Sequence, residues 1–227
     1  SGPLHRLYRL ARRYAIAKKK RLLRRFARGT ALLDVGCGSG EFLAHMARNG
    51  YKAEGVEPSP VARNAAQQAS GCHIASRLDL VDGSERFDAA TLWHVLEHLD
   101  NPSRCLRRLH ALLKPSGCLF IAVPDCESYD ARHYGPHWAA WDVPRHLWHF
   151  RKRDLQRLLS QHGFEVIQIR RMWLDAFYIA LLSERYKERH PAIAWAFALL
   201  MGCRSNAAAL FSGGSASSML AIARKSH

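Results

Sequence analysis

Residues 32–43 read LLDVGCGSGEFL, and this stretch decides the fold. A short apolar run carries one acid, Asp34, and glycines then follow at every second position, Gly36, Gly38 and Gly40. Glycine between a strand and a helix permits positive φ and lets the backbone approach a ligand closely. The helix that starts after the loop offers free N–H groups to a polar or anionic group. We therefore predict a ligand-binding loop between a buried strand and a helix.

From Thr30 onward the chain alternates between strand-like and helix-like segments. The expected strands are 31–36, 51–57, 72–76, 87–95, 118–125, 165–172 and 215–225. The expected helices between them are 41–50, 61–70, 101–113 and 153–164. Strands that alternate with helices indicate an α/β protein, with a mainly parallel sheet covered on both faces.

The length of 227 residues suits one sizeable domain with an appendage. We expect three parts: a basic helical arm at 1–28, a core made of 29–172 and 214–227, and a helical insert at 173–213. The insert is too long for a simple connection between two strands, and His190-Pro191 separates its two apolar helical stretches. It is interpreted as a lid, a dimer surface or a membrane-dipping element, with a lid packed on the core as the plain structural alternative.

The arm holds most of the excess charge. The net charge is +15, and residues 1–28 contain eleven Lys or Arg and no acid. Apolar residues recur there at helical spacing: Leu4, Leu7, Tyr8, Ala11, Tyr14 and Ala15. One interpretation is docking on anionic lipid or nucleic acid. The other is a helix packed by its apolar side with its arginines in water.

Cysteines and apolar runs bear on the compartment. The six cysteines form no CxxC pair, so neither a zinc ribbon nor a thioredoxin-like site is indicated, and we interpret them as reduced thiols. No apolar run reaches the ~18 residues of a membrane-spanning helix, because Arg204 interrupts the nearest one, 192–203. The start shows no apolar signal-peptide core. The expected location is cytoplasmic, with peripheral attachment at the inner face of the membrane as an extension.

Glu57 narrows the choice of ligand. It ends the second expected strand, 17 residues after Gly40, where an acid can accept both hydroxyls of a ribose. Two cofactors fit this arrangement. A dinucleotide prefers G-x-G-x-x-G, whereas the spacing here is G-x-G-x-G. S-adenosylmethionine has a ribose but no phosphates, so it needs no phosphate cradle.

Four motifs in order carry a resemblance. LLDVGCGSGEFL, EGVEPSP, FDAATLWHVLEHLDNP and LLKPSGCLFIAVP resemble the class I S-adenosylmethionine-dependent methyltransferases over about residues 30–172 and the final strand. The branch that the chain most resembles contains the ubiquinone-pathway O-methyltransferases and relatives with a PRHL-x-HF element, which is PRHLWHF at 144–150 here. The resemblance implies a Rossmann-like, doubly wound, seven-stranded sheet whose last strand is antiparallel. It also implies an enzyme with S-adenosylmethionine as its cofactor and S-adenosylhomocysteine as its product.

The resemblance also assigns cofactor contacts position by position. Glu57 would hold the ribose, and Pro58 would lie beside the adenine. Trp93 and His94 would lie at the end of the fourth strand, next to the methyl group. The methionine part would be lined by Asp34, Gly36, Cys37, Gly38 and Gly40.

Methyl transfer is an in-line displacement, so the enzyme mainly aligns the nucleophile, and an oxygen nucleophile must also lose its proton. The candidate groups in WHVLEHL are His94, Glu97 and His98. His94 and His98 share a face if the segment is helical. These side chains also offer metal ligands, but the pattern is not H-E-x-x-H and shows no third ligand, so no metal is predicted. The remaining alternative is a structural hydrogen bond between Glu97 and His98.

The second candidate constellation is HWAAWDVPRHLWHF at 137–150. Aromatic side chains make an apolar slot, and convergent polar groups orient a ligand within it. We predict that His146 and Asp142 join His98 in catalysis. We predict acceptor contacts from Trp138, Trp141, Arg145 and His149. The structural alternative pairs Asp142 with Arg145 and uses His149 to cap the helix that begins near Arg151.

The predicted function is methyl transfer to a small, lipophilic or aromatic acceptor, with O-methylation favoured. One alternative is a nucleic-acid methyltransferase that uses the arm, although WHVLEH lacks the NPPY-like element of many amino-group methyltransferases. The other is a non-catalytic cofactor-binding module, against which the intact glycine loop and Glu57 argue. The expected partners are the acceptor, an anionic membrane contacted through 1–28, and a second copy in a homodimer as an open option.

Overall fold

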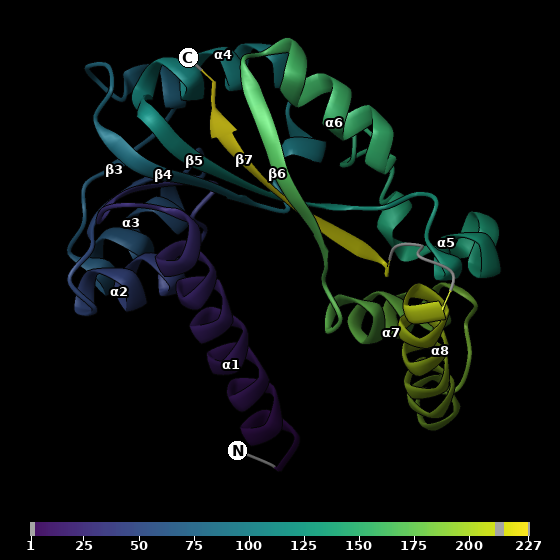
Figure 1. Ribbon diagram of the computed structural model, residues 1–227. Coiled ribbons are helices and arrows are strands. Elements are labelled where there is room, and N and C mark those ends of the chain that lie inside the picture. The colour runs from purple at the N-terminus through teal and green to yellow at the C-terminus, as the bar shows by residue number, and fades with distance from the viewer. Residues whose placement is uncertain (1–2, 212–215, 227) are drawn as a thin grey trace. The chain divides into compact units, whose positions relative to one another are not determined.

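The computed structural model describes residues 3–211 and 216–226, with side chains described from residue 12 onward. The strands are β1 Ala31–Val35, β2 Lys52–Val56, β3 Ile74–Ala75, β4 Phe87–Trp93, β5 Leu113–Pro124, β6 Phe164–Arg171 and β7 Ser218–Lys225. The α-helices are α1 Pro3–Phe26, α2 Glu41–Arg48, α3 Pro60–Ser70, α4 Pro102–Leu112, α5 Tyr129–Tyr134, α6 Lys152–Gln161, α7 Asp175–Tyr186 and α8 Pro191–Phe211 (Figure 1). Short 3-10 turns are Leu78–Leu80, Leu96–His98, Gly135–His137 and Ala139–Trp141.

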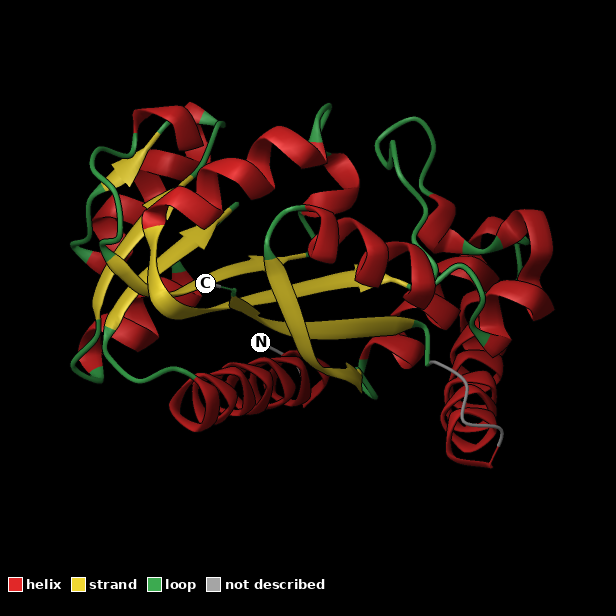
Figure 2. Cartoon of the chain, turned by 45° about the horizontal axis from the view of Figure 1, so that its top comes forward, coloured by secondary structure: helices red, strands yellow, loops and turns green. Residues whose placement is uncertain are grey.

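The strands form one seven-stranded sheet in the order β3-β2-β1-β4-β5-β7-β6. β1 pairs in parallel with β2, and β2 with β3, as alternation of strands and helices requires. The sheet is mainly parallel and the last strand, β7, is antiparallel, which confirms the predicted fold class. The strands are seen together in Figure 2. β5 is longer than predicted, because it begins at Leu113 and continues through Ser116 and Gly117.

By its contacts, the chain divides into two compact units. The first comprises the described residues up to Thr91, together with Arg107–Leu119 and the end of β7 from Lys225. The second comprises Leu92–Leu106 and the described residues between Phe120 and Arg224. The predicted division into arm, core and insert is drawn along the sequence, whereas these units follow contacts, and that division stays a prediction.

The first unit is organised around β1. Leu32 and Leu33 are fully buried, and α2 and α3 pack against each other beside β2. α3 begins where predicted, because the Ser59 hydroxyl accepts a hydrogen bond from the Ala62 N–H and Pro60 supplies a helix-compatible φ. The same helix ends at Gly71, whose φ of 67° is the left-handed conformation common after a helix.

The arm is one continuous helix, α1, seen beside the N label in Figure 2. The predicted apolar positions Leu4, Leu7, Tyr8 and Ala11 lie outside the residues whose side chains are described. Within the described part, Tyr14 is 59% exposed, whereas Leu22 and Leu23 are buried. The end of the arm nearest to β1 therefore packs on the first unit.

In the second unit, α7 and α8 lie side by side (Figure 1) and occupy the stretch predicted as a helical insert. They share a buried apolar cluster with Ala131, Tyr134 and Trp138 from the segment after β5. The serine and acid residues inside this cluster are hydrogen-bonded: Ala139 N–H donates to Ser183 Oγ, and the Tyr134 hydroxyl donates to Glu184. The segment that follows β5 is thereby held against α7.

One expectation about apolar runs needs correction. No run long enough to cross a membrane was expected, because Arg204 interrupts the apolar stretch. By length and composition alone, α8 is long and apolar enough to cross one, since a single arginine within 21 residues lowers the average hydropathy too little. A third of its most apolar part is buried in the protein.

Candidate active site

The glycine loop has the backbone that the sequence predicts. The φ angles are 72° at Gly36, 55° at Gly38 and 78° at Gly40, all in the left-handed region. A Cβ at Gly40 would lie 2.6 Å from the Ala66 Cα, so only glycine fits where α2 approaches α3. A Cβ at Gly38 would meet no atom within 4 Å. Gly38 therefore presents bare backbone toward open space, as a loop that receives a ligand requires.

Glu57 lies against this loop. One carboxylate oxygen accepts the Gly38 N–H at 2.9 Å, and the other accepts the Ser59 N–H at 3.0 Å. Two backbone donors from different segments therefore orient the acid that was predicted to hold the ribose. Pro58, which was predicted to lie beside the adenine, directly follows Glu57 and is exposed.

Asp34 lies in β1 and is 2% exposed. The Thr91 hydroxyl donates to it at 2.5 Å. Burial raises the pKa of Asp34 to about 7, against the opposing effect of the Thr91 hydrogen bond. Cys37 is half-buried, and burial, with Asp34 and Glu57 near it, raises the pKa of its thiol to about 12. This thiol therefore stays protonated and is no nucleophile at neutral pH.

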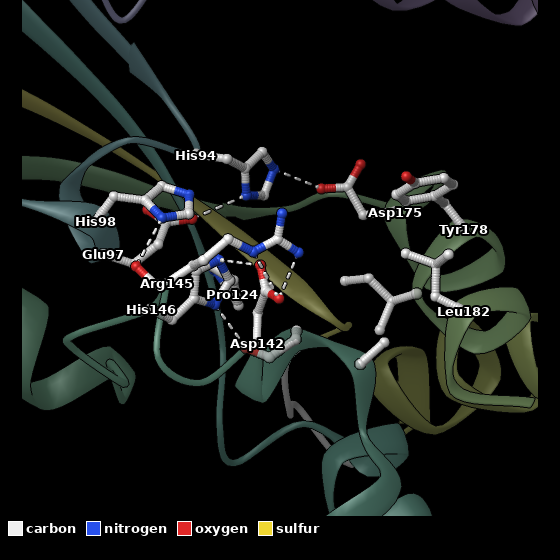
Figure 3. Close-up of a pocket in the computed structure, with 13 residues that line it drawn as sticks. His94, Glu97, His98, Pro124, Asp142, Arg145, His146, Asp175, Tyr178 and Leu182 are labelled. Carbon is white, nitrogen blue, oxygen red and sulfur yellow. Dashed lines mark hydrogen bonds and ion pairs between the residues drawn. The ribbon is translucent and has the colours of Figure 1, made fainter. Parts of the chain in front are cut away.

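The second unit contains a cavity of about 430 Å³ (Figure 3). Its polar lining is His94, Glu97, His98, Asp142, Arg145, His146 and Asp175. Its remaining lining is Pro124, Ala139, Ala140, Tyr178, Ile179 and Leu182. All three predicted catalytic residues lie here, although the segments that carry them are separated by more than forty residues. A volume of this size, with polar groups converging beside apolar side chains, is typical of a small-molecule site.

His94 follows directly after β4 with a φ of 57°, so the segment leaves the strand without forming a helix. The helical face that His94 and His98 were to share does not exist, and only Leu96–His98 forms a 3-10 turn. The His94 Nε2 atom lies 3.0 Å from Asp175 Oδ2, and Nδ1 lies 3.4 Å from Glu97 Oε1 (Figure 3). Burial lowers the pKa of His94, but the hydrogen bonds and charges of Asp175 and Glu97 outweigh it and raise the pKa to about 9. His94 is therefore an imidazolium at neutral pH.

The imidazoles of His98 and His146 lie edge to face, with ring centroids 4.6 Å apart. His98 Nδ1 lies 3.0 Å from the Arg145 carbonyl oxygen, and His146 Nδ1 lies 2.8 Å from that of Ala140. A carbonyl oxygen only accepts, so each Nδ1 carries a proton, and in the neutral form of either ring the lone pair lies on Nε2. Burial lowers the pKa of His146, which favours the neutral ring, the form that can accept a proton.

Glu97 joins these two histidines. Its side chain is fully buried. Apart from the contact of Oε1 with His94 Nδ1 at 3.4 Å, neither carboxylate oxygen has a hydrogen-bond donor among the described residues. One ligand atom from each of Glu97, His98 and His146 lies within 4.8 Å of the others. His146 is the third ligand that the sequence pattern did not reveal, so these residues have the chemistry to hold a divalent cation such as Zn²⁺.

Asp142 and Arg145 form an ion pair, with 2.6 Å between Arg145 Nη2 and Asp142 Oδ1. The pairing expected under the structural alternative is therefore present, and it is compatible with a place at the cavity. Asp142 Oδ2 also lies 3.8 Å from His146 Nε2. Asp142 thus orients Arg145 and lies close to the basic nitrogen of His146.

Three predicted acceptor residues do not line the cavity. Trp138 is 1% exposed in the core, and its indole N–H donates to Asp130. The Trp141 indole donates to the Gly135 carbonyl, and His149 Nε2 contacts the Trp141 carbonyl rather than capping α6. The aromatic cluster in the sequence is thus partly a core, because large rings after a strand satisfy burial before they serve a ligand.

Asp175 and Tyr178 are lining residues that the sequence reasoning missed. They belong to α7, 81 or more residues after His94. Asp175 reaches the His94 imidazole only because the tertiary structure places the start of α7 next to the end of β4. No local sequence spacing could have indicated this contact.

Comparison with known proteins identifies the family. A family model described as "Methyltransferase domain" matches residues 6–169, which is well over half of the chain. The chain belongs to this family. With its loop, its acid and its strand order, it is a class I S-adenosylmethionine-dependent methyltransferase, as predicted.

Two curated relatives of this methyltransferase are named ubiquinone biosynthesis O-methyltransferase. The protein from Azorhizobium caulinodans is 28% identical over 162 residues, which cover 65% of this chain and 64% of that one. The protein from Actinobacillus pleuropneumoniae serotype 5b is 34% identical over 134 residues, covering 53% and 55%. The chain thus spans less than two thirds of the length of these relatives.

Solved structures agree on the fold. The [4+2]-cyclase SpnF superposes with a TM-score of 0.65 at 21% identity, over 93% of this methyltransferase and 81% of the cyclase. The 1,6-didemethyltoxoflavin-N1-methyltransferase of Burkholderia thailandensis, solved with S-adenosylhomocysteine, gives 0.57 at 20% identity, over 88% and 72%. Because a cyclase and an N-methyltransferase share this architecture, the fold alone does not identify the acceptor.

Proposed function

We propose that the chain transfers a methyl group from S-adenosylmethionine to a hydroxyl of a small, lipophilic or aromatic acceptor. The observation that carries the proposal is the cavity, where two imidazoles, each with Nδ1 against a backbone carbonyl, line the same space as apolar side chains. An alcohol or phenol must lose its proton to act as a nucleophile, and these imidazoles are suited to take it. The names of the curated relatives support oxygen as the acceptor atom.

The residues of the first unit fit the cofactor. Open backbone at Gly38 suits close approach of a ligand, and Glu57 is oriented to accept from hydroxyls. The pKa of Asp34 is about 7, so the ammonium group of a bound cofactor would stabilise its carboxylate form. When bound, S-adenosylmethionine supplies an electrophilic methyl group on a sulfonium.

The residues of the cavity have separate roles in the proposal. His146 or His98 accepts the proton of the acceptor hydroxyl at Nε2, and the backbone carbonyls at Nδ1 hold each ring in the required tautomer. Asp142 is placed to stabilise the imidazolium that forms at His146, as a carboxylate beside a catalytic histidine does. The ion pairs of His94 with Asp175 and Glu97 hold the N-terminus of α7 against the turn after β4.

Calorimetric titration with S-adenosylmethionine and S-adenosylhomocysteine comes first in testing this proposal. Mass-spectrometric detection of methylated products from a panel of phenols, catechols and quinols follows. We expect both cofactor forms to bind and at least one hydroxylated aromatic compound to gain a methyl group on oxygen. A methyl group found on nitrogen or carbon would show that the acceptor atom is not a hydroxyl oxygen. Absence of cofactor binding by the folded protein would refute the proposal as a whole.

The two histidines give the sharper experiment. His98→Ala and His146→Ala should each lower turnover by about 10²-fold while cofactor affinity remains, since a general base contributes on this order. His137→Ala is the matched control, because His137 is an exposed histidine of the same segment that does not line the cavity. Full turnover in both cavity variants would contradict the assignment.

A further inference from the structure

α8 buries small residues and exposes large apolar ones, which is the opposite of the usual arrangement in a surface helix. A helix on the surface of a soluble domain buries its large apolar residues and exposes polar ones. In α8 the buried positions are mostly small: Ala194, Ala198, Met201, Gly202, Ser205 and Ala209. The exposed positions include Ile193, Trp195, Phe197, Leu199, Leu200, Leu210 and Phe211, each at least 41% exposed. We call these seven exposed side chains the α8 apolar face.

The inward side of α8 is firmly packed, so the face cannot be buried by turning the helix. A Cβ at Gly202 would lie 2.3 Å from a ring carbon of Phe177 on α7. Ser205 donates a hydrogen bond to the buried Asp130 at 3.0 Å. Rotation would break this bond and drive larger side chains into α7. The α8 apolar face therefore stays in contact with whatever surrounds the protein.

The charged residues within the stretch that carries the face are basic. Residues 189–211 contain no acid and two arginines, Arg189 and Arg204. The Arg189 guanidinium lies 4.1 Å from the ring centroid of Phe197, and its side chain remains 35% exposed, even though it also pairs with Glu184. Arg204 is exposed in the middle of the helix. Aromatic and aliphatic side chains beside basic ones match the boundary between anionic headgroups and acyl chains.

Two other occupants fit less well. A bilayer crossing would have to include α7, because α8 packs along it, yet α7 has 12 residues and reaches only about 18 Å of a core of about 30 Å. A symmetric dimer through this face would place the arginines of both copies in the same interface, where like charges oppose binding.

We infer that the α8 apolar face docks on an anionic lipid bilayer, with α8 lying in the plane of the interface. This assignment is independent of the reaction. One consequence rests on the function proposed above: α7, on which α8 packs, lines the cavity with Ile179 and Leu182, so docking brings the wall of the acceptor cavity to the membrane that dissolves a lipophilic acceptor.

The test is flotation of the full chain with vesicles of phosphatidylcholine alone and of equal parts phosphatidylcholine and phosphatidylglycerol. We expect the wild type to bind the anionic vesicles. Leu199→Gln with Leu200→Gln should weaken this binding about tenfold or more, because the transfer of two leucine side chains from water into the bilayer no longer contributes. The matched control is Val61→Gln with Leu80→Gln, two apolar residues on the other unit that are likewise more than half exposed. Both pairs are exposed, so neither substitution removes core packing.

Two further readouts make the inference refutable. Brominated lipids should quench wild-type tryptophan fluorescence, and Trp195→Phe should retain flotation but lose most of that quenching. Arg13→Glu with Arg21→Glu on α1 tests the arm. Abolition of flotation by the arm variant while the Leu199 and Leu200 variant floats normally would assign docking to α1 and overturn the inference. Absence of flotation, with a dimer in light scattering that the leucine substitutions convert to monomer, would show that a second copy covers the face.

Discussion

At the residue scale, Glu57 shows how a motif gains meaning from its geometry. The sequence predicts an acid at the end of a strand, and the structure shows that both of its oxygens are already oriented by the N–H groups of Gly38 and Ser59. A carboxylate held in this way loses little entropy on binding a diol. The same contacts tie the glycine loop to the end of β2.

We expect Glu57→Ala to weaken S-adenosylmethionine binding by about 10- to 100-fold, because charge-assisted hydrogen bonds to a diol are lost. Isothermal calorimetry measures the change. Glu165→Ala, at an exposed acid on β6, is the control and should bind normally. Unchanged affinity in Glu57→Ala would place the ribose elsewhere.

His94 gives a prediction about pH. Its folded-state pKa, about 9, lies above the ordinary value of 6.5, so the folded protein binds a proton more tightly than the unfolded chain. The resulting stabilisation is complete below pH 6.5 and is lost as the pH rises through about 9. We expect the melting temperature to fall over this window in the wild type and to fall less in His94→Gln. The side chain is 37% exposed, so screening by solvent moderates the effect. Parallel melting curves for the two proteins would contradict the ion-pair assignment.

The cluster of Glu97, His98 and His146 gives a prediction about metals. A Zn²⁺ ion held there would occupy the lone pairs that the proposed proton transfer requires. We expect Zn²⁺ to inhibit turnover by roughly tenfold or more, with recovery on chelation, and Mg²⁺ to inhibit little because it prefers oxygen ligands. Loss of turnover on chelation of untreated enzyme, with restoration by a metal, would instead show that the ion takes part in the reaction.

At the scale of elements, α1 shows that a run of basic residues does not by itself identify a binding surface. Its ten basic residues suggested a surface for anions, yet Leu22 and Leu23 are buried, and Lys20 donates to Asn49 at 2.7 Å. Arg12 pairs with Glu41 at the start of α2. The end of the arm that meets β1 is thus a structural helix, and contact of the arm with lipid or nucleic acid remains a proposal.

Packing of α1 predicts a cost in stability. Leu23→Ala should lower the free energy of unfolding by about 2–5 kcal/mol, because it leaves a cavity beneath a fully buried side chain. Tyr14→Ala, at a 59% exposed position of the same helix, should change it by less than about 1 kcal/mol. Denaturant titration measures both. Equal effects of the two substitutions would show that α1 does not dock by Leu22 and Leu23 in solution.

At the scale of the whole molecule, charge and site are separated in the sequence. Eleven of the positive charges belong to the first 28 residues, whereas the cavity is lined only by residues from His94 to Leu182. A net charge of +15 attracts polyanions without regard to sequence. Such attraction is compatible with a small-molecule enzyme and does not require nucleic acid as a substrate.

We therefore expect any binding of DNA to weaken steeply between low and physiological salt and no methyl group to be incorporated into it. Filter binding over a salt series and transfer of a labelled methyl group measure the two properties, with residues 13 and 21 changed to glutamate as the control for the arm. Methylated nucleic acid at physiological salt would favour the alternative function.

Sequence alone determined the order of strands and helices, the glycine loop, Glu57 and the methyltransferase family, because each depends on local spacing and on residues that backbone geometry demands. It also singled out His98, Asp142 and His146 as catalytic candidates; the structure places all three in the lining of the cavity, and their catalytic role stays a prediction. Tertiary structure alone decided the rest. It paired His94 with Asp175, brought Glu97 close to two imidazoles, buried Trp138 in the core and turned the large side chains of α8 outward. The physical reason is that burial and pairing depend on which distant segments meet, and periodicity along one helix or strand does not specify its neighbour.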